Sequence, residues 1–366
     1  MTRLWWAQIK AVIRLEMKKT LFARRGMWIY VLALLPLLLF MVSAGIVSHD
    51  RERSSRISTR SDKKLTYSEL QAVTPDMTSE EVIALLGKPP LHTRWREHRS
   101  TDHGHSEVIP HDRYHYSDGV HDLYVEFVDN KVVGIQISDG YTPPESSLVF
   151  AGVFQFFYLR LAIFFGCLGI FMNLFRGEVL DKSLHFYFLA PIRREVLMTG
   201  KFLAGLLATC IIFITSEALQ IAVFTSQFTP NARDLYLYQN HGLEQAAAYL
   251  GVTALACLGY GAFFLAAGIL FRNPILPAAA ILVWEAANPF LPALLKKFSV
   301  IYYLKSLCPV DIPSPPGTPA LLSLLVSNPD PVSRPAAILG VVGVSLLVLY
   351  ISTFQVRRME INYTTE

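Results

Sequence analysis

Six long apolar stretches limit this chain's fold more than any other feature. They lie at residues 27–47, 149–174, 202–226, 246–271, 275–295 and 336–356. Each is close to the roughly 20 residues that a helix needs to cross a hydrocarbon core about 30 Å thick. In lipid only helices and closed barrels satisfy their own backbone polar groups. The pattern therefore predicts an all-α polytopic membrane protein with six transmembrane helices.

Composition agrees with this class. Charged residues make up 17% of the chain, against about 25% in soluble domains. The net charge of +4 is small and dispersed, so nucleic acid is not an expected partner. The first apolar run lacks a small-residue cleavage site and is expected to be a span, not a cleaved signal. The four cysteines are expected to be packing residues, without metal or disulfides: Cys167, Cys210, Cys257 and Cys308.

Basic residues beside the spans predict their orientation. With six spans, most of them fall on one side of the membrane, which the positive-inside rule makes cytoplasmic. These residues are Arg24, Arg25, Arg176, Lys182, Arg193, Arg194, Lys201, Arg272, Arg357 and Arg358. Both termini, including the tail 357–366, are then inside, while 48–148 and the proline-rich segment 296–335 are outside. Lys296 and Lys297 oppose the pattern, so the fifth stretch is expected to be partly re-entrant.

The segment before the first span, residues 1–26, alternates apolar and basic residues at helical spacing. Val12 and Met17 can share one face, while Lys10 and Arg14 lie on the other. This predicts an amphipathic helix in the membrane surface, in contact with lipid. The alternative is a short cytosolic lead-in.

The external segment 48–148 is polar and begins with a Ser-, Arg- and Asp-rich stretch at 48–64, which predicts a flexible stalk. A compact α+β module follows. Thr78-Ser79-Glu80-Glu81 has the pattern of a capping box at a helix start. Alternating apolar residues at 123–127 and 133–137, joined by Asp129-Asn130-Lys131, predict a β-hairpin with one buried face.

Seven histidines gather in this external segment: His92, His98, His103, His105, His111, His115 and His121. Within it, the stretch Asp102-His103-Gly104-His105, His111-Asp112 and His115 could supply ligands to a transition metal. The spacing matches no specific zinc motif. The favoured alternative is a solvated insertion between helix and sheet that holds no metal.

The module resembles the SmpA/OmlA domain, the fold of a small lipoprotein in the outer-membrane barrel-assembly machine. Residues 77–89, Tyr114 and Tyr116, and residues 123–133 carry the resemblance, which covers about 65–138. It implies helices packed on a three-stranded sheet and contact with a periplasmic protein partner, without chemistry. The stalk and the absence of a lipobox cysteine depart from the lipoprotein pattern.

The segment 175–201 joins the second and third spans. It predicts a short amphipathic helix that ends at Pro191 and is followed by a basic turn. Such a helix is suited to take a push from a soluble partner into the membrane, although an ordinary charged connector has similar charges. The chain has no G-x-x-x-x-G-K-[ST] phosphate loop, since Gly200-Lys201 lacks the upstream glycine and the following hydroxyl.

Glu178, the run Leu189-Ala190-Pro191-Ile192-Arg193-Arg194-Glu195 and Gly200-Lys201 resemble the coupling-helix region of ABC-2 type transporter permeases. Arg193 departs mildly from the family, where Ser or Thr is commoner. The resemblance implies the permease subunit of an exporter in the bacterial inner membrane. It also implies a permease homodimer with two copies of an ABC ATPase, which binds ATP and Mg. Glu178, Arg193 and Arg194 are then expected to couple to that ATPase.

Ionisable residues within the apolar stretches are costly, by about 2.5–3.5 kcal/mol each at the bilayer centre. Arg160, Glu217 and Glu285 are of this kind. Glu285 with Asn288 is expected to line a translocation path or to support a helix break at Pro289. The alternative is that these charges reach toward the headgroups.

A non-transporting membrane scaffold or envelope sensor is the alternative function. A membrane-embedded enzyme is disfavoured, because the spans contain no paired acidic motif and no H-E-x-x-H sequence.

Overall fold

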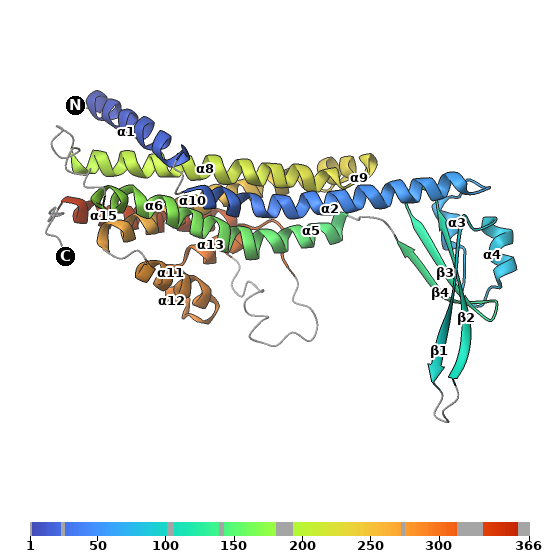
Figure 1. Ribbon diagram of the computed structural model, residues 1–366. Coiled ribbons are helices and arrows are strands. Elements are labelled where there is room, and N and C mark those ends of the chain that lie inside the picture. The colour runs from blue at the N-terminus through green and yellow to red at the C-terminus, as the bar shows by residue number, and fades with distance from the viewer. Residues whose placement is uncertain are drawn as a thin grey trace. The chain divides into compact units, whose positions relative to one another are not determined.

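The computed structural model describes residues 2–22, 26–100, 106–138, 143–180, 193–271, 275–312 and 332–357. The chain is mostly helical and has one small four-stranded sheet (Figure 1). It divides into two compact units. The helical unit comprises 1–40, 144–225 and 233–366, and the sheet unit comprises 41–143 and 226–232.

Five helices are long and apolar enough to cross a membrane, at Met27–Arg60, Ser146–Leu174, Arg194–Ser226, Gly242–Leu270 and Arg334–Arg357. The chain is therefore compatible with a multi-pass membrane protein. Four of these helices are α2 (Met27–Arg60), α8 (Arg194–Ser226), α10 (Gly242–Leu270) and α15 (Arg334–Arg357). The remaining one runs through α5 (Pro143–Gly152), the π-helical η2 (Val153–Ile163) and α6 (Phe164–Leu180). Before them lies α1 (Thr2–Phe22), and α9 (Pro230–Asp234) and η3 (Leu235–Gln239) separate α8 from α10.

Small residues let the long helices approach closely. Helix α10 packs against both α6 and α15. The ring of Phe171 on α6 lies against Gly205 of α8 and Gly261 of α10, where an added Cβ would come within 2.7 and 2.5 Å of it. Glycine at helix contacts is the usual means of close packing in membranes, where lipid tails give no hydrophobic drive between helices.

The fifth apolar stretch, expected to be a partly re-entrant span at 275–295, is not one continuous helix. Helix α11 (Ile275–Ala287) has 13 residues, about 20 Å at 1.5 Å per residue. After it come the 3₁₀ turn η4 (Asn288–Phe290), α12 (Ala293–Lys296) and α13 (Val300–Leu307). Pro289 and Pro292 interrupt the helix because proline has no backbone donor. Helix α13 packs against α10 and α15.

The sheet unit contains α3 (Tyr67–Gln71), α4 (Ser79–Leu86) and an antiparallel sheet in the order β1-β2-β3-β4. Its strands are β1 (Leu91–Ser100), β2 (Ser106–Ser117), β3 (Asp122–Val128) and β4 (Lys131–Ser138). The expected capping box is present, with the Glu81 amide donating to Thr78 Oγ1 and the Thr78 amide donating to Glu81 Oε2. The expected hairpin is β3–β4, and Asp129 and Asn130 at its turn have positive φ, as a two-residue type I′ turn requires.

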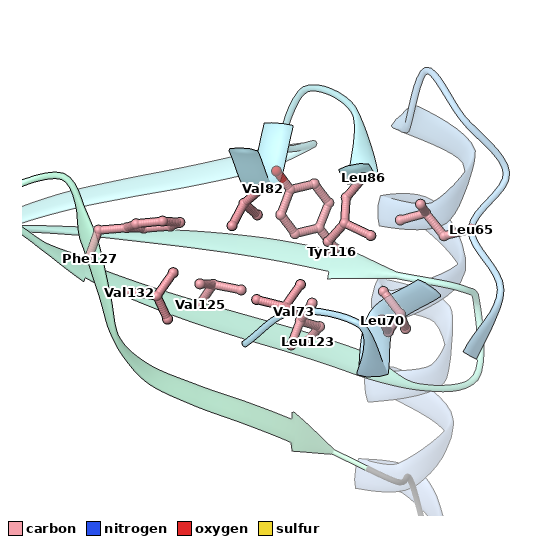
Figure 2. Close-up of a cluster of buried hydrophobic side chains, with 10 residues drawn as sticks. All are labelled: Leu65, Leu70, Val73, Val82, Leu86, Tyr116, Leu123, Val125, Phe127 and Val132. Atoms are coloured by element: carbon pink, nitrogen blue, oxygen red, sulfur yellow. The ribbon is translucent and has the colours of Figure 1, made fainter. Parts of the chain in front are cut away.

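The core of the sheet unit lies between the two short helices and one face of the sheet (Figure 2). On β3 the core members alternate, as the period-2 geometry of strands requires. On β4 the expected alternation is wrong at its start, since Val132 is buried and Val133 is 68% exposed. The core residues are Leu65, Leu70, Val73, Val82, Leu86, Tyr116, Leu123, Val125, Phe127 and Val132. Four strands are present where the SmpA/OmlA resemblance implies three. The histidine-rich stretch, expected to be a solvated insertion, instead contributes the long β1–β2 pair.

The expected flexible stalk is also wrong for most of its length, since α2 continues to Arg60. No glycine or proline interrupts 48–60, so the helix of the first span can propagate. Ser54 and Ile57 are each 6% exposed. Ser54 Oγ donates to Asp122 Oδ2 on β3 at 2.6 Å. A polar sequence therefore becomes helical because its few inward-facing residues pack on the sheet.

Candidate functional site

The predicted coupling segment is only partly described. Glu178 lies near the end of α6, and its backbone position alone is described. Residues 181–192, which include the predicted amphipathic helix, lie outside the described part of the chain. Arg193 and Arg194 stand at the start of α8. The structure therefore places one side of the predicted coupling site, the beginning of α8.

The beginning of α8 is attached to both ends of the described chain. The guanidinium of Arg193 lies over the ring of Trp5 on α1, 5.0 Å from its centroid. Arg194 Nη1 donates to the carbonyl oxygen of Arg357 at 2.9 Å, and Arg357 Nε donates to Glu195 Oε1 at 2.6 Å. Arg193, Arg194 and Arg357 thus lie at one end of the helical unit, together with α1 and the last turn of α15.

Two turns further along α8, Lys201 is fully buried. Its Nζ donates to Glu16 Oε1 of α1 at 2.7 Å and to the carbonyl oxygen of Leu174 of α6 at 2.9 Å. Gly200 makes room for this contact, because an added Cβ would lie 2.9 Å from Val12 Cγ1. Three helices are therefore joined through one ammonium group. The sequence pattern singled out Gly200-Lys201 but missed Glu16, the lone acid within residues 1–26, which lies one turn from Val12 on the buried face.

Glu285 and Asn288 hold the interrupted segment together. Glu285 Oε1 accepts from the Val300 amide at 3.0 Å, and its Oε2 accepts from the Ile301 amide at 2.8 Å and from Ser299 Oγ at 2.9 Å. The carboxylate thereby caps the N-terminus of α13, where amides lack helical partners and the helix dipole favours negative charge. Asn288 Nδ2 donates to the Lys296 carbonyl oxygen at 3.3 Å. These bonds favour the alternative in which both residues support the break at Pro289.

Glu217 is fully buried within the helical unit, so the interpretation that it reaches toward headgroups is wrong for this residue. Neither carboxyl oxygen has a hydrogen-bond partner within the described residues. The polar residues beside it on α8 are occupied elsewhere, since Ser216 Oγ donates to the Ala33 carbonyl oxygen and accepts from Gln220 Nε2. Arg160 on η2 lies over the ring of Phe156, 5.4 Å from its centroid.

The histidines of the sheet unit are distributed in pairs with carboxylates. His92 contacts Asp112 at 2.7 Å, His111 contacts Glu126 at 3.0 Å, His115 contacts Asp122 at 3.2 Å and His121 contacts Asp118 at 2.8 Å. In the described residues no three metal-ligating side chains come together. His103 and His105 lie outside the described part of the chain. The described geometry therefore gives the metal hypothesis no support.

Comparison with known protein families, curated proteins and solved structures finds no match to this chain, so its function is argued from its own residues.

Proposed function

We propose that this chain is the transmembrane permease subunit of an ATP-driven ABC-2 type exporter in a bacterial inner membrane. The observation that carries the proposal is the attachment of the beginning of α8. Arg193 and Arg194 follow the connection between the second and third spans, and they contact α1 and α15 directly. A push applied to this connection by a soluble ATPase would act on α8 and on both partner helices.

The proposal includes six membrane crossings with both termini in the cytoplasm. The fifth crossing is made in two pieces, α11 and α13. In support of this, Val300 at the start of α13 contacts Gly259 within α10, and Gln155 Nε2 donates to the Val310 carbonyl oxygen beyond its end. Discontinuous helices of this kind occur in transporters, where irregular backbone at membrane depth is shielded by protein.

Two copies of the chain would enclose the translocation path, and two copies of a separate ATPase would bind ATP and Mg. Glu285 and Asn288 are proposed to lie near this path as well as at the helix break. The Glu285→Gln variant tests the first role. Transport or ATPase activity equal to wild type at equal protein amount would remove Glu285 from the path.

The coupling proposal is tested by co-purification. The tagged chain is expressed with its genomic neighbours, and a phosphate-loop ATPase is expected to co-purify. The double variant Arg193→Glu, Arg194→Glu reverses two charges at the proposed docking point and should lose at least about 90% of the bound ATPase, a tenfold change for about 1.4 kcal/mol. The matched control is Arg56→Glu, Arg60→Glu, which makes the same charge change on exposed positions of α2.

Retention of the ATPase by the control and its loss from the docking variant would support the coupling role. Equal retention by both variants would contradict it. Arg194 also bonds the end of α15, so its replacement could destabilise the fold. Thermal unfolding of each variant in detergent shows whether the loss of bound ATPase results from such destabilisation.

A membrane scaffold or envelope sensor is the second candidate function. The observation in its favour is the sheet unit, which has its own core and packs directly on the second half of α2. One measurement in proteoliposomes distinguishes the two functions. It asks whether a substrate crosses the bilayer as ATP is consumed. ATP consumption without movement of any substrate would favour the scaffold.

A further inference from the structure

The face of the sheet opposite its hydrophobic core carries a groove of about 400 Å³. Arg53 of α2, Trp95 of β1, Arg113 and His115 of β2 and Tyr124 of β3 contribute to its lining. The register explains this grouping, since His115 pairs with Tyr124 across β2–β3 and Trp95 lies two residues from the partner of Arg113 on β1. Side chains on one face of a sheet alternate along each strand, so these residues share the face that the core does not use.

Two guanidinium groups line the groove. Arg53 and Arg113 come from different elements, and no carboxylate is found in the described lining. Arg113 Nη2 lies 3.5 Å from Glu126 Oε2, a long contact at a side chain that is 47% exposed. Arg53 has no ion-pair partner within the described residues. Two guanidinium groups facing one groove match an oxyanion, because each presents a fixed fork of N–H donors.

His115 is the buried member of the described lining. Its ring is 3% exposed, and Nε2 contacts Asp122 Oδ1 at 3.2 Å. Nδ1 is buried as well and has no hydrogen-bond partner among the described residues, so it lies beneath the surface of the groove. The contacts to a ligand are therefore left to the two guanidinium groups and the aromatic rings.

Aromatic rings line the same groove. Tyr124 stacks on His115 with their ring centroids 4.2 Å apart, and the guanidinium of Arg113 lies 4.9 Å from the Trp95 ring centroid. The rings hold the charged groups in place and offer flat apolar surface beside them. The groove therefore combines donors for an oxyanion with a surface for an apolar body.

We propose that this groove binds a phosphate monoester that carries a flat or apolar group. A phosphate monoester presents three acceptor oxygens and a charge of about −1.5 to −2 at pH 7 to Arg53 and Arg113. A carboxylate presents two oxygens and a single charge, so it would satisfy the two guanidinium groups less well. The same chemistry is found in a soluble phosphate ester and in the headgroup of a phosphomonoester lipid. The proposal does not depend on the exporter function.

The test uses the full chain in neutral detergent and titration calorimetry with phenyl phosphate. One binding site per chain is expected. Phenol, which has the ring without the charge, should give no heat, and benzoate should bind at least about tenfold more weakly, the loss of about one hydrogen bond. These ligand comparisons need no variant, so they hold even if a substitution disturbs folding.

The variant Arg53→Gln, Arg113→Gln should lower the affinity for phenyl phosphate about tenfold or more, since bonds to charged donors are the stronger ones. Its matched control is Arg56→Gln, Arg96→Gln, which removes the same charge from α2 and β1 at exposed positions outside the groove. The absence of binding at millimolar phenyl phosphate, equal binding of phenol or benzoate, or equal weakening by both variants would overturn the proposal.

Nanodiscs distinguish the two sources of the phosphate. If phosphatidic acid is the native ligand, its addition to phosphatidylcholine nanodiscs should weaken the apparent binding of phenyl phosphate. If the affinity is the same with and without phosphatidic acid, the ligand is a soluble ester.

Discussion

At the scale of single residues, Lys201 forms a buried ion pair that links three helices. Its ammonium group is fully buried, and Glu16 and the Leu174 carbonyl oxygen accept two of its hydrogen bonds. A buried ion pair gains little over an apolar pair, because both charges are removed from water. The loss of one partner, however, leaves an uncompensated buried charge. The pair is therefore most informative as a fixed link between α1, α6 and α8.

We expect Lys201→Met to destabilise the helical unit by roughly 3–5 kcal/mol, because the buried Glu16 carboxylate loses its ion pair with Lys201. The double variant Lys201→Met, Glu16→Met should recover much of this loss. Thermal unfolding in detergent measures both. The control is Arg334→Met, which breaks the exposed Arg334–Glu244 pair and should change stability by less than about 1 kcal/mol. Additive effects of the two buried substitutions would show that the pair is not coupled.

At the scale of elements, the attachment of α1 to α8 depends on shape as well as on charge. Val12 packs where Gly200 has no side chain. Because the nearest atoms belong to the base of the Val12 side chain, rotation cannot relieve a clash there, and α1 itself would have to shift.

We expect Gly200→Ala to loosen α1, so that a protease cleaves within residues 2–22 faster than in wild type. The cost in stability should be about 1–3 kcal/mol, as for other overpacked contacts. Val12→Ala should relieve it in the double variant. Gly251→Ala is the control, because nothing lies within 4 Å of the added Cβ, and it should be neutral or stabilising by up to about 1 kcal/mol. Equal cleavage of the two glycine variants would contradict this packing.

Helix α13 depends in the same way on a single carboxylate from α11. We expect Glu285→Ala to leave the Val300 and Ile301 amides without acceptors and to cost about 1–3 kcal/mol. Glu285→Gln keeps one acceptor oxygen and should lie between alanine and wild type. Hydrogen exchange of the peptide that covers 299–307 measures the loss of this cap directly, because the Val300 and Ile301 amides should exchange faster. Unchanged protection in Glu285→Ala would mean that the cap is dispensable.

At the scale of the whole molecule, the two units draw their stability from different sources. The helical unit relies on close helix packing through glycine, whereas the sheet unit has a small apolar core rimmed by charged pairs. Hydrogen bonds from Arg94, and then from His92, hold the pKa of Asp112 below its ordinary value. Burial would raise the pKa of Asp122, but hydrogen bonds from His115, Ser54 and Ser117 outweigh burial and lower it.

These shifts predict that the sheet unit is sensitive to acid. A carboxyl with a lowered folded pKa stabilises fully above its unfolded pKa, about 3.9 for Asp, and this stabilisation is lost as pH falls through the folded pKa. Urea titrations of the full chain, followed by hydrogen exchange of β2–β4 peptides, should therefore show a falling free energy of unfolding below about pH 4. Asp122→Asn should be less stable at neutral pH and show a smaller fall. A free energy independent of pH between about 6 and 3 would contradict the account.

The sequence predicts the elements whose signals are local. Of the six spans that apolar length predicts, five are helices long enough to cross a membrane. The capping box at Thr78 and the turn at Asp129-Asn130 predict α4 and the β3–β4 hairpin. The sequence-based prediction fails where a residue distant in the chain determines the local structure. Residues 48–60 are predicted to be a polar stalk, because nothing in the local sequence indicates that Ser54 and Ile57 pack on the sheet. The β1–β2 pair was missed for the same reason, since its polar face conceals the alternation.

The candidate sites divide along the same line. The sequence by itself determined that two ionisable residues, Glu217 and Glu285, lie within apolar stretches. It also determined that basic residues precede α8. The order of residues along the chain is sufficient for both conclusions. Only the tertiary structure decided the partners of these residues. In the structure Glu285 caps the start of α13, Lys201 pairs with Glu16, and Arg53 and Arg113 line one groove. The physical reason is that a charge buried away from water needs a specific partner, and that partner comes from whichever element folding brings beside it.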